Sequence, residues 1–366
     1  GPEGLAQRAV LRVGLSAGDV GTLDPHRSGA TQTVAITNAI FNGLVRFRPG
    51  SANPAHIEPD LATSWETSSD GLTWTFYLRR GVQFHRGYGE LTAQDVVYSL
   101  QKAADPKRSA FSTDYAALES VEALDDYTVR IRFKERIPSV LGILANYHGG
   151  MILSKKAAEE LGDRFALNPV GTGPFAFREY APQQYVRLVR HDAFFRGRPQ
   201  VEEILYRFMP DVRSRQAAFQ AGELDVIEGL REQWWVDEIA KDRSAVIDII
   251  GPGEMRTLHF NMSIKPLDDL RVRQAIAHAI DLDELMAFIG KKVTIPAPSP
   301  VPPGYLGYTA DLPRYPHSVE TARALLARAG YPGGLRLGRV VITEYDSLRR
   351  PMEVLQEQLR RAGITF

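Results

Sequence analysis

The sequence predicts a globular protein of the mixed α/β class with more than one lobe. Strand-like alternation and helix-like periodicity of apolar residues follow one another along the whole chain, which is the pattern of α/β folds. With 366 residues, of which 44% are hydrophobic and 24% charged, the chain is long enough for two or more domains with cores of their own. No internal repeat and no low-complexity linker interrupts the alternation.

The first part of the chain is expected to form strands paired around short turns, with helices between them. The turn Ser69-Asp70-Gly71 has the residues that tight turns prefer. Thr92 is expected to cap a helix, with Asp95 three residues later completing a capping box. The expected strands lie at 9–17, at two places within 61–85 and at two places within 117–135, and the expected helices at 33–44 and 91–105.

The rest of the chain continues this alternation. Gly222 is expected to end a helix, and Asp281 to start one. Residues 293–316 are too rich in proline for a regular helix or sheet, and 364–366 resemble the start of a strand. The expected strands lie at 175–180, 185–195 and 201–210, after Gly222, at two places within 245–263 and at 335–345; the expected helices lie at 154–165, 214–222, 268–290, 318–330 and 348–363.

The segment NPVGTGPFAFREY, residues 168–180, has the composition of a loop that binds an anion. A phosphate loop needs a helix N-terminus directly after its glycines, because the backbone N–H groups and the helix dipole hold the anion together. Here Phe175 and Phe177 alternate as in a strand, and no Lys-Ser or Lys-Thr pair follows Gly173. The sequence therefore favours a tight structural turn at Gly171-Thr172-Gly173-Pro174.

The charge balance argues against a polyanionic partner. Forty-four Lys and Arg residues balance 44 Asp and Glu residues, so no global field would hold nucleic acid or an anionic membrane. No apolar run approaches the roughly 18 residues of a membrane span, and the N-terminus lacks the apolar region of a secretory signal, so any signal peptide is expected to have been removed. Because the chain has no cysteine, disulfides, thiolate metal sites and cysteine nucleophiles are excluded.

Patterns that suggest catalysis lack the context that they need. Ser16 in GLSAG fits a nucleophile elbow, but the residues DVGTLDP that follow cannot start the required helix. Ser99 and Lys102 fit S-x-x-K without its companion motifs S-D-N and K-T-G. The eight histidines show no paired ligand spacing, so neither a metal nor a cofactor is expected. The pair Trp234-Trp235 is expected to divide between core and surface.

The order of nine motifs resembles the extracytoplasmic solute-binding proteins of family 5, which are the peptide-, nickel- and opine-binding components of ABC importers. The motifs extend over almost the whole chain. They are GTLDPH (21–26), IFNGLVRF (40–47), PDLATSWETSSDGLTWTFYLRRGVQFHRG (59–87), LTAQDVVYSL (91–100), NPVGTGPFAF (168–177), QAGELDVIEG (220–229), LHFNMS (258–263), DDLRVRQAIAHAIDLDEL (268–285) and ARALLARAGYPGG (322–334).

The resemblance implies a bilobal α/β receptor with the type II fold of periplasmic binding proteins and an extra subdomain inserted in lobe I. Residues 4–38 and 165–251 would form the core of lobe I, 39–164 the inserted subdomain, and 252–366 the N-terminal part of lobe II. The turn at 171–174 would lead from the insert back into the core sheet. Family members usually run on past the position of Phe366, so the second lobe is expected to be incomplete, with its remainder and a C-terminal return segment outside this sequence.

The resemblance also implies where a solute would bind. Ser28, Gly29 and Ala30 match the backbone segment that pairs with an extended ligand in the oligopeptide-binding branch, with plain turn structure as the alternative.

Side chains of both lobes match the family's cleft positions. Phe111 and Tyr147 match loop positions that face the cleft from lobe I. In a strand expected at 254–260, Arg256 would pair with a ligand carboxylate and His259 would meet the ligand. Ile342 and Thr343 stand nearest to the arginine of the dipeptide binders, which argues against a clamp of that kind here.

A receptor for import, without catalysis, is the function that the resemblance implies. The solute would be an oligopeptide or a related small molecule, and the partner an ABC transporter permease. The protein would lie in the periplasm, or be lipid-anchored outside the cell in a bacterium with one membrane, without inserting into the membrane. A receptor that signals to another protein instead of a permease fits the same motifs.

Overall fold

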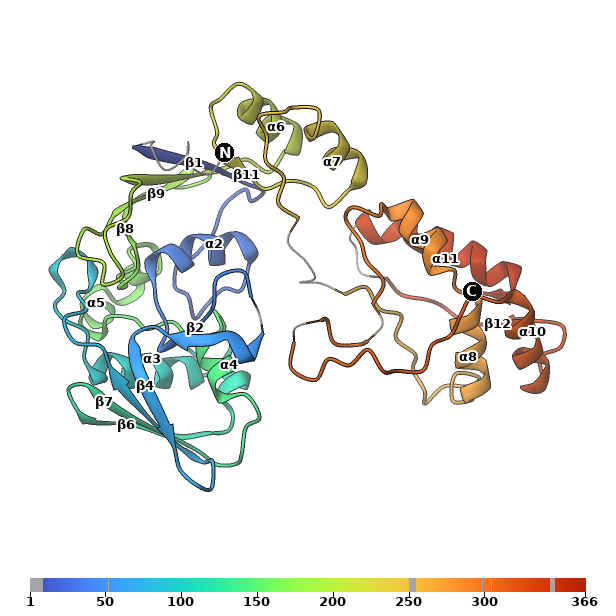
Figure 1. Ribbon diagram of the computed structural model, residues 1–366, viewed down its shortest axis with the longest axis horizontal. Coiled ribbons are helices and arrows are strands. Elements are labelled where there is room, and N and C mark those ends of the chain that lie inside the picture. Colours follow the sequence, from blue (N-terminus) through green and yellow to red (C-terminus); the bar gives the residue numbers. More distant parts are fainter. Residues whose placement is uncertain (1–8, 52, 250–254, 298, 304, 343–345) are drawn as a thin grey trace. The chain divides into compact units, whose positions relative to one another are not determined.

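The computed structural model describes residues 9–366 apart from 52, 250–254, 298, 304 and 343–345. The chain divides after Gly229 into two compact units, 1–229 and 230–366, and each is described by itself. Both units combine helices with strands (Figure 1), as the mixed α/β prediction requires. The lobe boundaries expected from the family resemblance remain a prediction.

A five-stranded sheet in the first unit is built from the beginning and the end of that unit's sequence. Strand β1 pairs in parallel with β10 on one side and β11 on the other, and β9 and β8 continue the sheet antiparallel beyond β10. Because parallel strands end at the same edge, the carboxyl ends of β1, β10 and β11 lie together. In the order of the sheet the strands are β11 (Val226–Ile227), β1 (Val10–Leu15), β10 (Glu203–Phe208), β9 (Tyr185–Arg190) and β8 (Phe175–Ala181), and α6 (Val212–Gln220) connects β10 to β11.

A second sheet of the first unit has four antiparallel strands and is covered by α3 (Ala93–Ala104), which packs on β6 and β7. The row Trp65, Phe76, Val129 faces the core, whereas Arg130 and Glu122 of the neighbouring row pair on the outer face at 3.9 Å. The strands are β4 (Ala62–Thr67), β5 (Thr73–Leu78), β7 (Thr128–Phe133) and β6 (Leu118–Asp125). Helix α3 starts with the predicted capping box of Thr92 and Asp95.

Shorter elements complete the first unit, and they include several that periodicity did not predict. Among these, β2, β3 and α4 are too short to show a period. The remaining elements are α2 (Thr31–Ile40), β2 (Val45–Phe47), β3 (Ile57–Pro59), α4 (Val140–Ala145), α5 (Lys155–Leu161) and the 3₁₀ turns Pro54–His56, His85–Gly87, Ser112–Tyr115 and Gly162–Leu167. Strands β2 and β3 pair with each other, and α4 packs on both.

The turn Gly171-Thr172-Gly173-Pro174 packs against the C-terminal end of α2. Gly173 N–H donates to Ile40 O at 2.8 Å, and a Cβ on Gly173 would lie 2.6 Å from Ala39 O. A Cβ on Gly171 would overlap Ile40 O. On the other side the His85 ring donates from Nε2 to Gly173 O at 2.9 Å. The glycines thus let backbone meet backbone directly before β8, and the predicted structural turn is confirmed.

The second unit is held by helices around one small apolar core. Leu326 and Leu359, on α10 and α11, are among its buried residues, and Asp281 caps α9 as predicted. Trp234 is 53% exposed and Trp235 is 7% exposed, so the tryptophan pair divides as expected. The elements are α7 (Gln233–Ile239), α8 (Leu270–Ala279), α9 (Leu282–Ile289), α10 (Val319–Arg328), β12 (Leu335–Arg336), α11 (Asp346–Arg361) and β13 (Ile364–Thr365).

Two predictions of strands in the second half of the chain are wrong. Residues 245–249 and 255–263 form no strand, and of 335–342 only Leu335 and Arg336 pair, with β13. Leu258 and Phe260 still pack against the core of the second unit, so the alternation marks burial without a neighbouring strand. Residues 250–254 and 343–345 of these predictions lie outside the described part of the chain.

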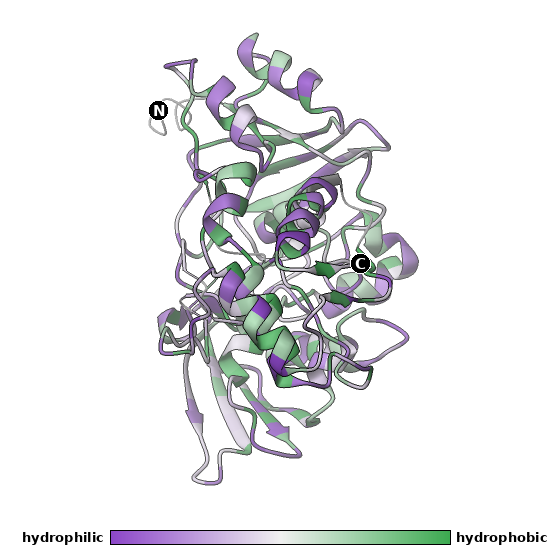
Figure 2. Ribbon diagram, turned by 90° about the vertical axis from the view of Figure 1, so that its right-hand side faces the viewer, coloured by the Kyte–Doolittle hydropathy of each residue, from purple (hydrophilic) through white to green (hydrophobic). Residues whose placement is uncertain are grey.

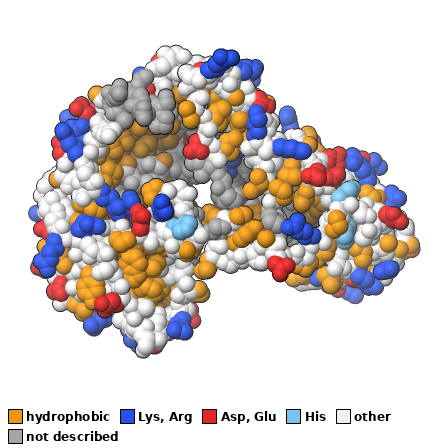
Figure 3. Space-filling view, in the orientation of Figure 1, with side chains coloured by type: hydrophobic (Ala, Val, Ile, Leu, Met, Phe, Trp, Pro, Cys, Tyr) orange, Lys and Arg blue, Asp and Glu red, His pale blue; other side chains and the backbone are white. Residues whose placement is uncertain are grey.

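The surfaces agree with the balanced composition. Hydrophilic and hydrophobic residues alternate along single helices, as amphipathic helices over a core require (Figure 2). Charges of both signs are interspersed on the visible face of each unit (Figure 3). In the residues that the structure describes, no helix combines the length and the apolar character needed to cross a membrane.

The contact between the glycine turn and α2 can be tested by adding one methyl group. Gly171→Ala is expected to lower the free energy of unfolding by about 1–3 kcal/mol, because the methyl group would overlap Ile40 O. Urea unfolding followed by tryptophan fluorescence measures the change. Gly18→Ala is the matched control, since among the described residues, its chain neighbours aside, no atom lies within 4 Å of its Cβ position. Equal midpoints for the two variants would show that the turn does not need glycine.

Candidate functional site

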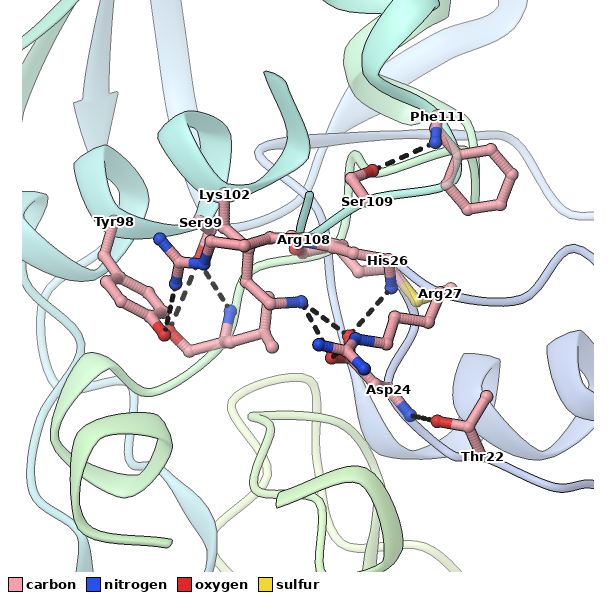
Figure 4. Close-up of polar contacts among 12 residues, drawn as sticks. Thr22, Asp24, His26, Arg27, Tyr98, Ser99, Lys102, Arg108, Ser109 and Phe111 are labelled. Atoms are coloured by element: carbon pink, nitrogen blue, oxygen red, sulfur yellow. Dashed lines mark hydrogen bonds and ion pairs between the residues drawn. The ribbon is translucent and has the colours of Figure 1, made fainter. Parts of the chain in front are cut away.

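The candidate site is built on the turn that leads from β1 into α2. Asp24 is buried in this turn and forms an ion pair with Lys102 of α3, whose Nζ lies 2.7 and 2.8 Å from the two carboxylate oxygens (Figure 4). Both side chains are 7% exposed. Burial lowers the pKa of Lys102, and the Asp24 carboxylate opposes this effect. Because a buried charge is stable only when paired, each residue fixes the other.

His26 closes the same turn from inside the protein. Its ring is fully buried and donates from Nε2 to Met151 O at 2.9 Å, which leaves Nδ1 as the nitrogen without a proton. Burial, assisted by the charge of Lys102, lowers the pKa of His26 to about 3. The backbone His26 O accepts from Ala110 N–H at 2.9 Å, so the turn is tied to the loop before Phe111.

The residues that follow this anchored turn are open to solvent. Gly29 and Ala30 are exposed and Ser28 is half-buried. Ala30 has an extended backbone conformation and is the N-cap residue of α2, with Ser28 Oγ accepting from its N–H at 3.3 Å. An extended, accessible segment on a rigid support can offer its remaining backbone groups to a ligand.

Aromatic side chains stand beside the exposed backbone. A Cβ at Gly29 would lie 3.4 Å from the Phe111 ring and 3.7 Å from the Tyr147 ring. Phe111 is nearly buried, whereas Tyr147 is 38% exposed. The His148 ring stacks on Phe111 with centroids 4.6 Å apart and meets Tyr147 edge to face at 4.3 Å. We call Phe111, Tyr147 and His148 the aromatic wall.

The structure brings together five of the seven site residues expected from the family resemblance. Ser28, Gly29, Ala30, Phe111 and Tyr147 form one surface of the first unit. That they bind a solute remains a prediction.

Arg256 and His259, the other two expected site residues, belong to the second unit. Both are exposed there in a segment without strand structure, and His259 Nε2 lies 2.7 Å from Thr257 Oγ1. Their contact with a solute remains a prediction.

Sequence reasoning missed His148 and Asp114. Asp114 Oδ2 lies 3.2 Å from His148 Nδ1, and the two residues are 34 positions apart in the sequence. His148 could have been suspected because it directly follows Tyr147, an expected site residue. Nothing in the sequence pattern indicates that Asp114 lies beside it.

The S-x-x-K pattern at Ser99 and Lys102 has a structural role. Ser99 Oγ donates to Asp95 O at 2.7 Å and accepts from Leu153 N–H at 2.9 Å, while Lys102 pairs with Asp24. Both polar groups are therefore engaged in packing α3 against neighbouring segments.

A second polar network joins the end of the first unit to the first turn of α2. Gln32 Nε2 lies 3.0 and 3.1 Å from the two carboxylate oxygens of Glu228, and one of these oxygens also accepts from Ser16 N–H at 3.0 Å. Burial opposes the ionisation of Glu228, but the hydrogen bonds from Ser16 and Gln32 outweigh it and lower its pKa. The buried Arg215 donates from Nε to Glu228 O at 3.0 Å.

Ser16 does not have the setting of a catalytic nucleophile. Its Oγ accepts from Gln32 Nε2 at 2.8 Å, and no helix occurs between residues 17 and 30, all of which the structure describes. Within the described ranges, no three His, Cys, Asp or Glu side chains are grouped in a way that could hold a metal ion.

Comparison with known proteins gives one consistent family. The sequence profile described as "Bacterial extracellular solute-binding proteins, family 5 Middle" matches residues 56–366. Heme-binding protein A of Haemophilus influenzae is 32% identical over 363 residues, covering 90% of this chain and 64% of its own. The dipeptide-binding protein of Escherichia coli K12 is 29% identical over 364 residues, covering 92% and 67%. The chain thus spans about two thirds of the length of these curated relatives.

A solved structure extends the comparison to the fold. The solute-binding protein MoaA from A. tumefaciens R10, in complex with mannopinic acid, superposes with a TM-score of 0.80 at 42% identity, covering 98% of this chain and 72% of its own. The predicted fold class, that of periplasmic binding proteins, is thereby confirmed.

The buried ion pair can be tested by removing one partner. Lys102→Met is expected to lower the free energy of unfolding by about 3–5 kcal/mol, because Asp24 would lose its buried counter-charge and keep only the exposed Arg27, whose Nε lies 3.7 Å from Asp24 Oδ2. Adding Asp24→Asn should recover part of the loss. Lys155→Met is the control, because it removes an exposed ion pair in which Lys155 Nζ lies 4.0 Å from Glu159 Oε1. It is expected to lower the free energy of unfolding by less than about 1 kcal/mol. Similar losses in Lys102→Met and Lys155→Met, measured by urea unfolding, would contradict the anchoring role.

The buried histidines predict a loss of stability in acid. Burial lowers the pKa of both His26 and His85 to about 3, from 6.5. Between these values the unfolded chain binds protons that the folded protein does not, so the free energy of unfolding falls as the pH drops from about 6.5 toward 3. Each histidine contributes up to about 1.4 kcal/mol per pH unit.

Urea unfolding at a series of pH values measures this dependence. His26→Gln should reduce the slope by one histidine's share, because glutamine can still donate to Met151 O but does not titrate in this range. His56→Gln, which replaces an exposed ring, is the control and should keep the slope. An unchanged slope in His26→Gln would mean that His26 is accessible to protons in the folded protein.

Proposed function

This chain belongs to the bacterial extracellular solute-binding proteins of family 5, and on that premise we propose that it is the solute receptor of an ABC importer. It binds a peptide or a peptide-like small solute and delivers it to the transporter's permease. It acts outside the cytoplasm, in the periplasm or attached to the outer face of the membrane. It carries out no catalysis.

One observation of geometry carries the proposal. The backbone of residues 28–30 lies exposed beside the aromatic wall, and the turn before it is fixed by the buried pair of Asp24 and Lys102. A rigid open backbone gives affinity through main-chain hydrogen bonds, and aromatic rings add apolar contact at a small cost in side-chain entropy. This combination suits a small solute with peptide-like polar groups.

The proposed contacts follow from the chemistry of the residues. Gly29 offers its backbone without a side chain to shield it, and Tyr147 presents an exposed ring next to it. From the second unit, Arg256 supplies a cation for a ligand carboxylate and His259 a ring nitrogen. Backbone recognition accounts for most of the affinity in this scheme, and the side chains select the solute.

An opine is a second candidate solute, and one comparison favours it. At 42% identity, the protein whose structure contains mannopinic acid is more similar than the dipeptide-binding protein, at 29%. The position nearest to the arginine of dipeptide binders is held by Ile342, with Thr343 outside the described residues. Both facts favour an acid other than a dipeptide.

Solute binding can be tested by thermal unfolding of the full-length product of the gene. A panel of mannopinic acid, agropinic acid, dipeptides, longer peptides, glutathione and haem draws on the solutes named for similar proteins. A solute at 100 times its Kd is expected to stabilise the protein by about 2.7 kcal/mol. Gly29→Val should weaken this stabilisation by covering the backbone, whereas Gly18→Val should not, since its Cβ position is open.

The panel also decides between binding and catalysis. A thermal shift in the wild type, with the solute recovered unchanged, agrees with a receptor. Conversion of a solute to product would instead make the protein an enzyme, and no shift with any member of the panel would contradict the proposed function.

A further inference from the structure

We propose that His148 contacts the solute through Nε2, which accepts a hydrogen bond from a hydroxyl or amino group, and that Asp114 positions the ring for this role. The inference rests on the proposed function, because it concerns the same surface. It adds a residue that selects the chemical class of the solute: a molecule with a hydrogen-bond donor placed beside the aromatic wall.

The ring of His148 has a fixed place in the wall. It lies nearly parallel to the Phe111 ring, at an interplanar angle of 8°, and at 83° to the Tyr147 ring. Phe111 and Tyr147 are the same two rings that face Gly29. His148 is therefore separated from the exposed backbone of residues 28–30 by no more than one layer of side chains.

Asp114 determines which nitrogen of His148 is free. A carboxylate can only accept, so at 3.2 Å from Asp114 Oδ2 the Nδ1 atom carries the hydrogen. In the neutral ring Nε2 then has an unshared electron pair and is an acceptor. In the part of the chain that the structure describes, this nitrogen has no hydrogen-bond partner. The His148 side chain is 35% exposed, so part of the ring borders solvent.

The loop that carries His148 is held in one conformation. Asn146 Oδ1 accepts from His148 N–H at 3.3 Å, and Gly149 N–H donates to Tyr147 O at 2.9 Å. Gly149 has a φ of +82°, and a Cβ there would lie 2.9 Å from the Tyr115 ring. Because the loop needs this backbone geometry, Nε2 is placed before any solute binds, which reduces the entropy lost on binding.

Other histidines of the first unit differ from His148 in their partners. His26 and His85 are buried, and each uses Nε2 on a backbone carbonyl, that of Met151 or Gly173. Their role is to hold segments of the chain together. His148 instead pairs with a side-chain carboxylate at a partly exposed position, so its remaining nitrogen is available for a ligand.

Calorimetric titration of the full-length protein with mannopinic acid tests the contact directly. His148→Leu is expected to weaken binding about tenfold, which is the effect of one lost hydrogen bond. His148→Gln, whose amide oxygen can accept, should recover most of the affinity. His56→Gln, which replaces an exposed histidine away from this surface, is the control and should bind like the wild type.

Nitrogen NMR of the imidazole rings tests the role of Asp114 separately. The unliganded wild type should show His148 as the Nδ1–H tautomer, and Asp114→Asn should shift the ring toward a mixture of tautomers with weaker binding. Addition of mannopinic acid should move the Nε2 resonance of the wild type. A simple structural role for His148 would leave that resonance unchanged.

The outcomes separate this inference from the proposed function. If mannopinic acid binds the wild type and His148→Leu equally well, the inference is wrong and the receptor function stands. If the wild type binds neither mannopinic acid nor any other solute of the thermal panel, both the function and the inference fail. Weaker binding by His148→Leu, recovery by His148→Gln and a shifted Nε2 resonance together support the contact.

Discussion

The buried ion pair of Asp24 and Lys102 is the constraint on which the candidate site depends. It joins residues 78 positions apart, and it holds the turn after β1 against α3. Two charges removed from water are costly, so this arrangement persists only because each charge neutralises the other at hydrogen-bonding distance. Exposed pairs such as Arg132 with Glu119 contribute little by comparison. The turn that precedes the exposed backbone of residues 28–30 is therefore held in place.

The parts of the fold that could be predicted from sequence are those with local signals. Two helix starts could be predicted, at Thr92 with Asp95 and at Asp281, because a capping side chain acts within three residues of its own position. The two strands expected within 245–263 do not form in its described residues. Alternation gives a sheet only where a neighbouring strand is available, and Leu258 and Phe260 pack on an apolar core instead. Helix α4, with six residues, leaves no period to detect.

Only part of the candidate site could be predicted from the sequence. The segment 28–30 and the aromatic residues Phe111 and Tyr147 were expected only through the order of family motifs, and the structure does place them side by side. Asp114 and His148 could not be predicted, because their contact is set by two loops that meet in space. Lys102 was visible as part of a motif, but its meaning depended on Asp24, which sequence spacing does not reveal.

Main-chain binding and side-chain selection place different demands on one surface. Backbone hydrogen bonds tolerate many solutes, so a receptor that relies on them alone would be broad in its choice. A placed acceptor adds discrimination, since a solute without a matching donor would bury that nitrogen unpaired. In the proposed scheme the first unit combines both devices, with the backbone of residues 28–30 for main-chain binding and His148 as the placed acceptor.

The network of Glu228, Gln32 and Ser16 has a mechanical consequence. Gln32 stands two residues after Ala30, and Glu228 is followed by Gly229, the residue at which the first unit ends. The hydrogen bonds from Gln32 and Ser16 therefore tie the last residues of the first unit to the start of α2, close to the exposed backbone. Any shift of the first turn of α2 would strain the bond between Gln32 and Glu228.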